Sequence, residues 1–562
     1  KCGLMSSIDN TGENEFNDDE SNIIGKSEDN EDEEITDKIK DEIKEDINII
    51  TKKENRYNDE SQFCFEITPE ELKEKLYQKS GKPIMIFDIG NKERYQKEHI
   101  PGSKFAVCDQ QTINSLLPKL PKNIDIVLVS ENEDYTRQMA QMAREKGGLR
   151  TRYLKGGISA WNDEKTEIQD PKISANDLKI AIDEDKVKRG NIFLLDVRSP
   201  EEFNQWSIEE STNIPLGQIS SLLNEIPKDK EIVTICPQGN RAGMATFMLQ
   251  REGYNVKTLQ EGLKGWSSAV EHFSQEYEII DGQKVKVVQV RKIGKGCISY
   301  IMSFSDNNTT TNDEAIVIDP VFPIDEYIRI AISEIGDRAK ITKVLDTHLH
   351  ADHVSSAREL ANKIDAQLYL SSYEEYSQGM YQKQSQKQFT PIKEGDVLTI
   401  GKKDGKPIEL KVIHTPGHTA GGICFLIGEK LLFTGDTLFV DSIGRPDLRD
   451  KVEEFASMLY NTLHNKIFNI HNKKDIIIFP AHTDKIINRD EMVSDNLDNI
   501  QKKLVILDLD KIDFVRKISS INMPTPSQFK EIILMNKGEK TITSLEGIQE
   551  LEMGPNRCSI SI

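Results

Sequence analysis

The sequence predicts an α/β fold made of three consecutive domains. Two segments, residues 62–168 and 172–274, repeat one pattern in which apolar strands alternate with helices, which is typical of a parallel sheet. From residue 283 to 562 strands come in groups that helices then follow, so this part has a different architecture. At 562 residues the chain has room for about three to four domains.

The first 60 residues are strongly acidic. They hold 20 Asp and Glu against 8 Lys and Arg, so more than half of the formal net charge of −21 lies in this short stretch. With few aromatic residues the segment cannot bury enough apolar surface to offset the entropy of ordering it, and we predict a disordered tail. The acidic balance argues against nucleic acid and anionic membranes as partners. No stretch is apolar for long enough to predict a membrane span or a signal peptide.

Seven cysteines are spread along the chain without CxxC spacing. Their odd number and wide separation argue against a disulfide framework or a zinc knuckle, which predicts a reducing, cytoplasmic environment. Most of them are expected to be small buried hydrophobes, with Cys236 as the exception. The seven are Cys2, Cys64, Cys108, Cys236, Cys297, Cys424 and Cys558.

Each repeat runs through the same series of elements. Each begins with a capped helix, at Thr68 and at Ser174, and continues to an apolar strand that ends in an aspartate, Asp88 or Asp196. A second apolar strand, a loop and a helix follow, and each copy ends on a Gly/Trp segment. We therefore expect two copies of one domain.

The loop after the last strand separates the two copies. In the second copy it reads Cys236-Pro-Gln-Gly-Asn-Arg-Ala242, and a helix follows at once. Successive backbone N–H groups, the positive end of that helix and Arg241 all favour a thiolate at Cys236. Such a thiolate can attack a sulfane sulfur and hold it as a persulfide.

Both segments resemble the rhodanese fold over nearly their whole length, and the second loop resembles the rhodanese active-site loop. The resemblance implies that Cys236 is the nucleophile and that Gly239 and Arg241 shape its cradle.

The first copy has Ser130 where the nucleophile is expected. Its loop also carries Glu131, Glu133 and Asp134, which would repel an anionic sulfur donor. We therefore predict that the first copy is inactive and has a structural role.

One stretch of the third domain, Thr347–His353, places three imidazoles and a carboxylate directly after a short apolar strand. Borderline metal ions bind imidazole nitrogen and carboxylate oxygen, and a strand-to-loop junction lets alternate residues converge. Ser355 is a predicted cap for an amphipathic helix behind this loop, over about 357–364. The candidate ligands in the stretch are His348, His350, Asp352 and His353.

Three further candidate ligands lie at the ends of later strands. His418 follows a Pro-Gly turn, and Asp436 and His482 each end an apolar run, so one cleft can collect them all. His414 falls inside a strand, and we expect it to be structural.

This set of motifs resembles the metal-binding signature of the metallo-β-lactamase fold, which implies an αββα sandwich. The segment Gly435-Asp-Thr-Leu-Phe-Val-Asp-Ser-Ile-Gly-Arg-Pro-Asp447 looks like that of persulfide dioxygenases, with Arg445 and Asp447 as candidates for the substrate pocket. The last motif departs from the family, because Thr483 stands between His482 and Asp484.

Ligand spacing alone leaves two metal chemistries open. Seven donors can hold two zinc ions, as in hydroxyacylglutathione hydrolases, or one ferrous iron, as in persulfide dioxygenases. The resemblance to the dioxygenases implies one Fe(II) per chain, with His348, His418 and Asp436 as a facial triad. The other candidates, His350, Asp352, His353 and His482, then belong to a surrounding shell or a second site.

The combined prediction is a persulfide dioxygenase fused to a rhodanese. It would oxidise glutathione persulfide or an analogous thiol persulfide with O2 to sulfite and thiol, and exchange sulfur with thiosulfate or sulfite through Cys236. The alternatives are a dizinc thioester hydrolase with accessory rhodanese domains and a non-catalytic sulfur-carrier scaffold. A short linker is expected over about 269–284, and a homo-oligomer is compatible with the sequence.

Overall fold

The computed structural model describes residues 65–77, 84–100, 102–106, 125–147, 150–162, 171–279, 283–304, 314–377, 389–403, 406–447, 451–483, 487–521, 528–541, 544–554 and 558–560. The predicted acidic tail, residues 1–60, lies outside these ranges, as do Cys2, Cys64, Cys108 and Asp484.

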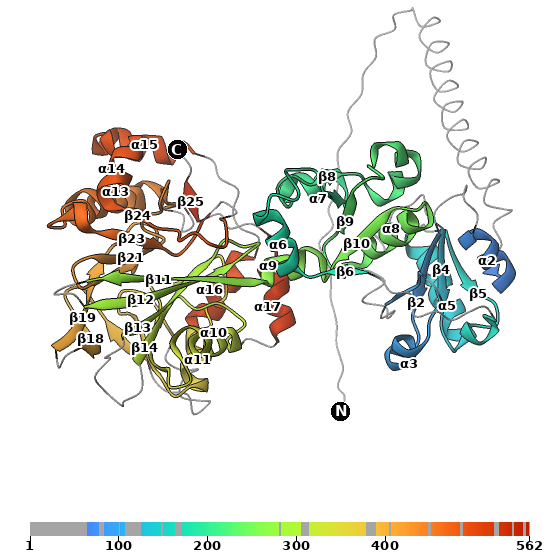
Figure 1. Cartoon of the computed structure of the whole chain (residues 1–562), viewed down its shortest axis with the longest axis horizontal. Coiled ribbons are helices and arrows are strands. Elements are labelled where there is room, and N and C mark those ends of the chain that lie inside the picture. Colours follow the sequence, from blue (N-terminus) through green and yellow to red (C-terminus); the bar gives the residue numbers. More distant parts are fainter. Residues whose placement is uncertain are drawn as a thin grey trace, which may run out of the picture. The chain divides into compact units, whose positions relative to one another are not determined.

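The two predicted repeats share one topology (Figure 1). The main strands run in the order β5-β4-β2-β3 in the first copy and β10-β9-β7-β8 in the second, and neighbouring strands in each order are parallel. The first copy consists of β1 (Glu66–Ile67), α2 (Pro69–Tyr77), β2 (Ile84–Asp88), α3 (Lys92–Lys97), β3 (Lys104–Phe105), β4 (Asp125–Val129), α5 (Glu133–Gly147) and β5 (Thr151–Leu154). The second consists of β6 (Lys172–Ile173), α6 (Ala175–Asp183), β7 (Ile192–Asp196), α7 (Pro200–Gln205), β8 (Thr212–Asn213), β9 (Glu231–Ile235), α8 (Asn240–Arg251), β10 (Asn255–Leu259) and α9 (Gly262–Ser268).

Local sequence explains why these helices begin where they do. The Ser174 side chain accepts a hydrogen bond from the Asp177 N–H, which caps α6. In α7 the Ser199 hydroxyl and the Glu202 carboxylate form a reciprocal capping box. The Thr68 hydroxyl likewise accepts from the Glu71 N–H at 3.2 Å, so both predicted caps, Thr68 and Ser174, are present as side-chain hydrogen bonds.

The third domain is built on two larger sheets. The first has the strand order β11-β12-β13-β14-β15-β16-β17 and the second β18-β19-β20-β21-β23-β24. The first sheet comprises β11 (Val270–Glu278), β12 (Lys284–Lys292), β13 (Ile298–Phe304), β14 (Glu314–Ile318), β15 (Lys340–Leu345), β16 (Gln367–Ser371) and β17 (Thr390–Ile392). The second comprises β18 (Val397–Lys403), β19 (Lys406–His414), β20 (Ile423–Ile427), β21 (Leu431–Gly435), β23 (Ile477–Pro480) and β24 (Asp495–Asn496).

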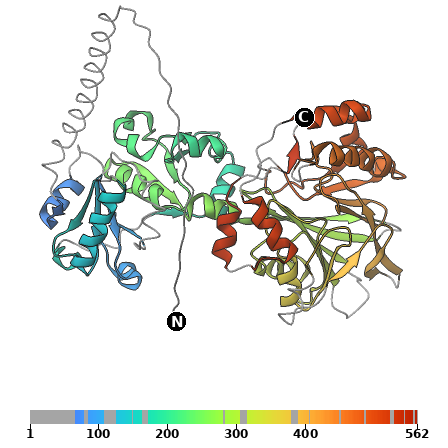
Figure 2. The same cartoon turned by 180° about the vertical axis from the view of Figure 1, so that it is seen from behind.

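Helices cover the outer faces of both sheets (Figures 1 and 2). Buried apolar side chains from both sheets form one core between them, including Tyr300, Phe433 and Phe479. The helices packed on the first sheet are α10 (Asp325–Ile335) and α11 (Ala357–Lys363), and those on the second are α13 (Val452–Thr462), α14 (Leu497–Lys503) and α15 (Lys511–Ser519). This αββα sandwich confirms the predicted fold class.

The prediction of a linker over residues 269–284 is wrong. Most of it forms β11, which pairs with β12 in an antiparallel register from Val270 opposite Lys292 to Glu278 opposite Lys284. An edge strand has one free face and one free edge, so polar residues are tolerated in it and no apolar run marks it in the sequence.

The chain after residue 520 returns to the metal domain. It forms α16 (Phe529–Lys537), α17 (Leu545–Leu551) and β25 (Ser559–Ile560), and β25 pairs with β22 (Ile443–Gly444). Within the described part of the chain, no helix is both long and apolar enough to cross a membrane.

Candidate metal centre and sulfur-transfer loop

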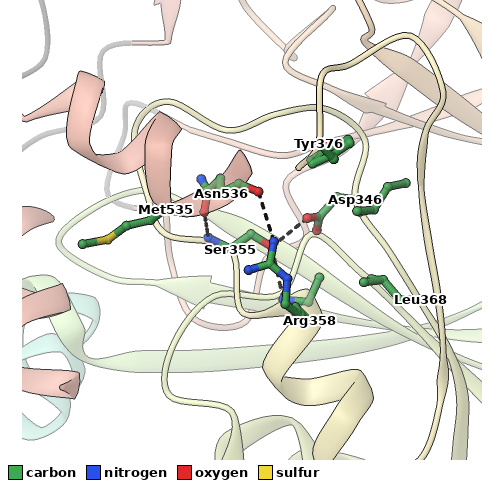
Figure 3. A pocket seen from close by; sticks show the side chains of 9 residues that line it. Asp346, Ser355, Arg358, Leu368, Tyr376, Met535 and Asn536 are labelled. Atoms are coloured by element: carbon green, nitrogen blue, oxygen red, sulfur yellow. Dashed lines mark hydrogen bonds between the residues drawn. The ribbon is translucent and has the colours of Figure 1, made fainter. Parts of the chain in front are cut away.

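The histidine-rich loop leaves the end of β15 and enters α11. The Ser355 hydroxyl donates to Asp346 Oδ2 at 2.7 Å and accepts from the Ala357 N–H at 3.1 Å. Ser355 thus contacts the first residue of α11, but the N-cap position is Ser356 and not Ser355 as predicted. Figure 3 shows Asp346, Ser355 and Asn536 linked side by side around a small pocket behind the loop. Burial raises the pKa of Asp346 to about 6.

Two histidines of the predicted triad have fixed tautomers. His348 Nδ1 lies 2.9 Å from Thr347 Oγ1, which itself donates to Asp319 Oδ2, so the His348 Nδ1 is the protonated nitrogen. His418 Nδ1–H donates to the Arg445 carbonyl oxygen at 2.8 Å. In both rings the Nε2 lone pair is therefore left for another partner.

The third member, Asp436, faces both of these lone pairs. His348 Nε2 and His418 Nε2 each lie 3.5 Å from Asp436 Oδ2, and all three atoms are buried without a hydrogen-bond partner in the described structure. Burial lowers the pKa of His418 to about 4 and also lowers that of His348, which keeps both rings neutral. Two neutral imidazoles and a carboxylate that converge without partners fit a metal ion.

The His350 ring is also held by a polar contact, but through Nε2, whereas His348 and His418 are held through Nδ1. Its Nε2 lies 3.2 Å from Asp319 Oδ1, and its Nδ1 is buried without a partner. Asp319 also accepts from the Thr347 N–H at 2.6 Å, so one carboxylate holds the loop backbone and two side chains of the site. Asp319 directly follows β14 and adopts the left-handed region, at φ 51°, and its role was not predicted from the sequence.

The remaining predicted ligands form a second group beside the first. His482 Nε2 lies 2.7 Å from Asp352 Oδ2, and His353 Nδ1 lies 3.1 Å from the same oxygen. His482 Nδ1 also lies 2.5 Å from Asp436 Oδ1, which connects the two groups. Although burial opposes it, His482 and His353 hold the pKa of Asp352 well below its usual range.

Two cysteines that the sequence analysis treated as packing residues border these ligands. Cys297 Sγ lies 3.5 Å from Asp352 Oδ2 and 3.6 Å from His353 Nδ1. Cys558 groups with Asp436 and His482. Each cysteine is distant in sequence from the ligands that it contacts. Spacing along the chain therefore could not predict that Cys297 and Cys558 lie beside the metal site.

The C-terminal segment holds the histidine loop by its backbone. Asn536 Nδ2 donates to the carbonyl oxygens of His350 and His353, and the Val354 N–H donates to Glu552 Oε1 at 2.7 Å. Glu552 is itself buried against Lys292. Neither Asn536 nor Glu552 was identified as a site residue from the sequence.

Arg445 and Asp447, the candidates for a substrate pocket, pair with each other. Arg445 is almost fully buried, and its Nε and Nη2 each donate to Asp447 at 2.6 Å. The Arg445 carbonyl oxygen orients His418, so the backbone of this segment supports the metal centre directly. His414 lies apart from the ligand groups, stacked on Tyr373.

The loop of the second repeat forms the predicted cradle around Cys236. The Gly239 and Ala242 N–H groups donate to Cys236 Sγ at 3.1 and 3.3 Å, and Gly239 adopts φ 88° at the start of α8. Gly262 packs against this loop so closely that a Cβ there would lie 2.1 Å from the Cys236 carbonyl oxygen. Close packing against the Cys236 loop therefore requires a glycine at position 262, in the Gly/Trp segment that ends the repeat.

Electrostatics at Cys236 differ from the sequence expectation in one respect. Arg241 is paired with Glu202 through two hydrogen bonds of 2.8 and 2.7 Å, so part of its charge is neutralised. Burial raises the pKa of Cys236 above its usual value, whereas the loop N–H groups and Arg241 act in the opposite direction.

The first repeat has a loop of the same form without a thiol. Ser130 Oγ is buried, lies 2.7 Å from Thr136 Oγ1 and accepts from the Asn132 N–H. Glu131 pairs with Arg94, which also binds Asp88. The Ser130 hydroxyl and the Glu131 carboxylate are therefore already paired within the first repeat.

A buried cluster of imidazoles and carboxylates lies at strand ends of an αββα sandwich, and two α/β repeats precede it. This arrangement defines a metal-binding class of protein with two appended α/β domains. The family described as "Metallo-beta-lactamase superfamily" matches residues 309–482, and the family described as "Rhodanese-like domain" matches residues 68–164 and 174–269. The chain therefore belongs to the metallo-β-lactamase superfamily and carries two rhodanese-like domains, as the sequence predicted.

Individual relatives cover parts of the chain. It is 30% identical over 176 residues to an uncharacterized protein of Aquifex aeolicus, which covers 29% of this chain and 75% of that protein. It is 27% identical over 247 residues to a cytoplasmic hydroxyacylglutathione hydrolase of Arabidopsis thaliana, which covers 43% of this chain and 84% of the hydrolase. A crystal structure of ETHE1 from Myxococcus xanthus matches at a TM-score of 0.37 and 23% identity, over 45% of this chain and 97% of that one.

Proposed function

We propose that the third domain is an iron-dependent persulfide dioxygenase. The observation that carries this proposal is the triad of His348, His418 and Asp436, whose facing donor atoms are buried, mutually close and without partners. Two imidazoles and one carboxylate on one face leave the remaining positions of an Fe(II) ion open for two small ligands. When bound, the iron would supply the activation of O2 and of the persulfide sulfur.

The chain's own residues position the centre and exclude water from it. Thr347 and the Arg445 carbonyl fix the ring orientations of His348 and His418, while Asp319 fixes the backbone at Thr347, directly before His348. The burial of all these groups keeps bulk water away from the reacting sulfur. The overall reaction is R–S–SH + O2 + H2O to R–SH and sulfurous acid, which ionises to sulfite.

We further infer that the second rhodanese-like domain exchanges sulfur through Cys236. The loop N–H groups around its Sγ suit an anionic terminal sulfur as well as a thiolate. A persulfide on Cys236 can pass its outer sulfur to sulfite, which yields thiosulfate and returns the thiol. The second rhodanese-like domain would thus transfer sulfane sulfur, the same form of sulfur that the proposed dioxygenase oxidises.

The experiment uses the full chain purified without oxygen. We expect about one iron per chain, oxygen uptake on addition of glutathione persulfide, and sulfite as a product. The Cys236→Ser variant should keep oxygen uptake near the parent rate and lose thiosulfate formation. The Ser130→Ala variant should change neither reaction, and a loss of sulfur transfer in it would contradict the assignment of the first copy as inactive.

A dizinc thioester hydrolase is the second candidate, and two observations favour it. His350 Nδ1 and His353 Nε2 also lack hydrogen-bond partners, and His482 Nε2 faces Asp352 Oδ2 at 2.7 Å, so donors for a second ion are present. Relatives such as the Arabidopsis thaliana protein are named hydroxyacylglutathione hydrolases. Two zinc ions per chain, no iron, and hydrolysis of S-lactoylglutathione without oxygen uptake would establish this candidate and reject the dioxygenase.

A further inference from the structure

Lys295 is a buried lysine without a counter-charge. Only 6% of its surface is exposed, and its Nζ has no hydrogen-bond or ion-pair partner among the described residues. Each of the other buried lysines and arginines in the described part of the chain lies within 3.9 Å of a carboxylate oxygen, as Arg291 does beside Glu271 and Lys292 beside Glu552. A buried charge without a partner is unfavourable, so Lys295 indicates a place for an anion that binds from outside.

The turn that carries Lys295 is packed closely on both sides. The Gly294 N–H donates to the Trp266 carbonyl oxygen in α9 at 3.2 Å, and a Cβ at Gly294 would lie 2.4 Å from the Trp266 ring. The Gly296 carbonyl oxygen accepts from the Thr483 N–H at 2.9 Å, and a Cβ at Gly296 would lie 2.1 Å from the Thr483 carbonyl oxygen. The fold therefore fixes the backbone of Lys295 and keeps this lysine out of bulk water.

The two sides of this turn lead to the two candidate reaction centres. On one side α9 begins against the sulfur-transfer loop, because the Leu263 N–H donates to the Cys236 carbonyl oxygen at 2.8 Å. On the other side Thr483 directly follows His482, a candidate metal ligand. Lys295 thus lies in the segment whose backbone contacts connect the Cys236 loop with the metal centre.

We propose that Lys295 binds a small sulfur oxyanion, sulfite or thiosulfate, at this turn. The identity of the anion rests on the proposed function, because the dioxygenase releases sulfite and the Cys236 persulfide converts sulfite into thiosulfate. In that transfer the S–S bond of the persulfide breaks, its outer sulfur forms a bond to the sulfur of sulfite, and the electron pair of the broken bond stays on the Cys236 thiolate. Lys295 takes no part in the bond changes and holds the anion close to the two centres.

The chemistry of the side chain favours an oxyanion over the carboxylates of the thiol carrier. A lysine ammonium is a compact point charge that suits a small anion, whereas the planar fork of arginine matches a carboxylate. S-methylglutathione carries carboxylates and no sulfur oxyanion, so it separates these two sources of negative charge. It should bind equally to the parent protein and to Lys295→Met.

Sulfite binding to the full, reduced chain tests the site, because sulfite does not react with a free thiol. In isothermal titration calorimetry Lys295→Met should bind sulfite at least about 10-fold more weakly, while Lys295→Arg should stay within about threefold of the parent. Without oxyanions in the buffer Lys295→Met should melt about 2–4 °C higher than the parent, since it keeps the length of the side chain and removes the unpaired charge. With persulfide and O2 supplied, its ratio of thiosulfate to sulfite should fall.

Lys264→Met is the matched control. Lys264 is a lysine of α9 that is as little exposed but is paired with Glu546 at 3.2 Å, so its loss should change sulfite affinity by less than about twofold. Unchanged sulfite binding in Lys295→Met, or weaker binding of S-methylglutathione alone, would overturn the proposal. A parent protein that binds no sulfite would also reject it, even if the variants fail to fold. Sulfite binding needs no iron, so a chain that binds sulfite without oxygen uptake would reject the dioxygenase and retain this site.

Discussion

Asn536 Nδ2 donates a hydrogen bond of 2.8 Å to the carbonyl oxygen of His353, although the two residues lie 183 positions apart in the sequence. The same nitrogen donates to the His350 carbonyl at 2.9 Å, and Asn536 Oδ1 accepts from the Ser355 N–H (Figure 3). A single side chain in α16 therefore satisfies three backbone groups of the histidine loop. A loop that carries ligands needs such fixed partners, because it has no regular hydrogen-bonded structure of its own.

Replacing Asn536 should weaken metal binding without removing a ligand. We expect Asn536→Ala to lower metal affinity about 10- to 100-fold, as measured by competition with a coloured chelator. Asn536→Asp keeps an acceptor for the Ser355 N–H but loses both donors, so it should also bind metal weakly. Glu539→Gln, an exposed change close by in the chain, is the control. Unchanged affinity in Asn536→Ala would mean that the loop is rigid by itself.

The buried pair of Lys292 and Glu552 should be costly to break from one side. Glu552→Gln keeps an oxygen for the Val354 N–H but leaves the Lys292 ammonium buried without a counter-charge. We expect a loss of about 3–5 kcal/mol, seen as a lower melting temperature of the metal-domain transition in calorimetry. All three tryptophans lie in the rhodanese-like repeats, so calorimetry reports this transition more directly than tryptophan fluorescence.

Neutralising both partners separates charge burial from packing. Lys292→Met combined with Glu552→Gln should recover most of the lost stability, because no unpaired charge remains. Glu550→Gln, an exposed change in α17, should have no measurable effect. If the double variant is as unstable as Glu552→Gln alone, the pair acts through packing and not through charge.

The repeats and the ligand set were predictable because their signals are local. Each signal spans only a few residues, as in the helix cap at Ser174, the apolar strands and the short motif around His348. Because neighbouring strands end at the same edge of a sheet, ligands that follow different strands can be expected to lie close together. The strand β11 was missed because an edge strand tolerates the polar residues found there.

The residues that support the site could not be predicted, for a physical reason. Cys297 reaches His482 through a bridge between distant loops, and Asn536 and Glu552 reach the histidine loop from helices at the other end of the domain. Such contacts depend on tertiary packing, which a single sequence does not encode in any short spacing. The pairing of Arg241 with Glu202 was missed for the same reason.

That pairing leads to a prediction about the pH dependence of sulfur transfer. Glu202 partly neutralises the Arg241 charge, which otherwise lowers the pKa of Cys236. Glu202→Gln removes a negative charge near the thiol and keeps the capping box, so it should stabilise the thiolate and lower that pKa. The acid limb of kcat/KM for thiosulfate should move to lower pH, with an increase of about two- to tenfold below the parent pKa.

The neighbouring Glu201 provides the control for this change. Its carboxylate is exposed, so Glu201→Gln removes the same charge from α7 without touching the Arg241 pair, and the pH profile should stay in place. A shift of the acid limb to higher pH in Glu202→Gln would show that Glu202 matters chiefly for holding Arg241 in position.

The triad should hold its iron independently of the second ligand group. His418 contributes only to the triad, so His418→Ala should lower iron affinity by more than about 100-fold, more than the loss expected for a supporting residue, and abolish oxygen uptake. Asp436→Ala should also abolish iron binding and oxygen uptake, but it is a less selective probe because Asp436 contacts His482 as well. His482→Ala should retain the iron and reduce oxygen uptake less, since this imidazole lies off the triad. The measurement is the metal content of each full-length variant after anaerobic purification. Equal loss of all metal in His418→Ala and His482→Ala would mean that the two groups form one dinuclear site. The hydrolase alternative requires that arrangement.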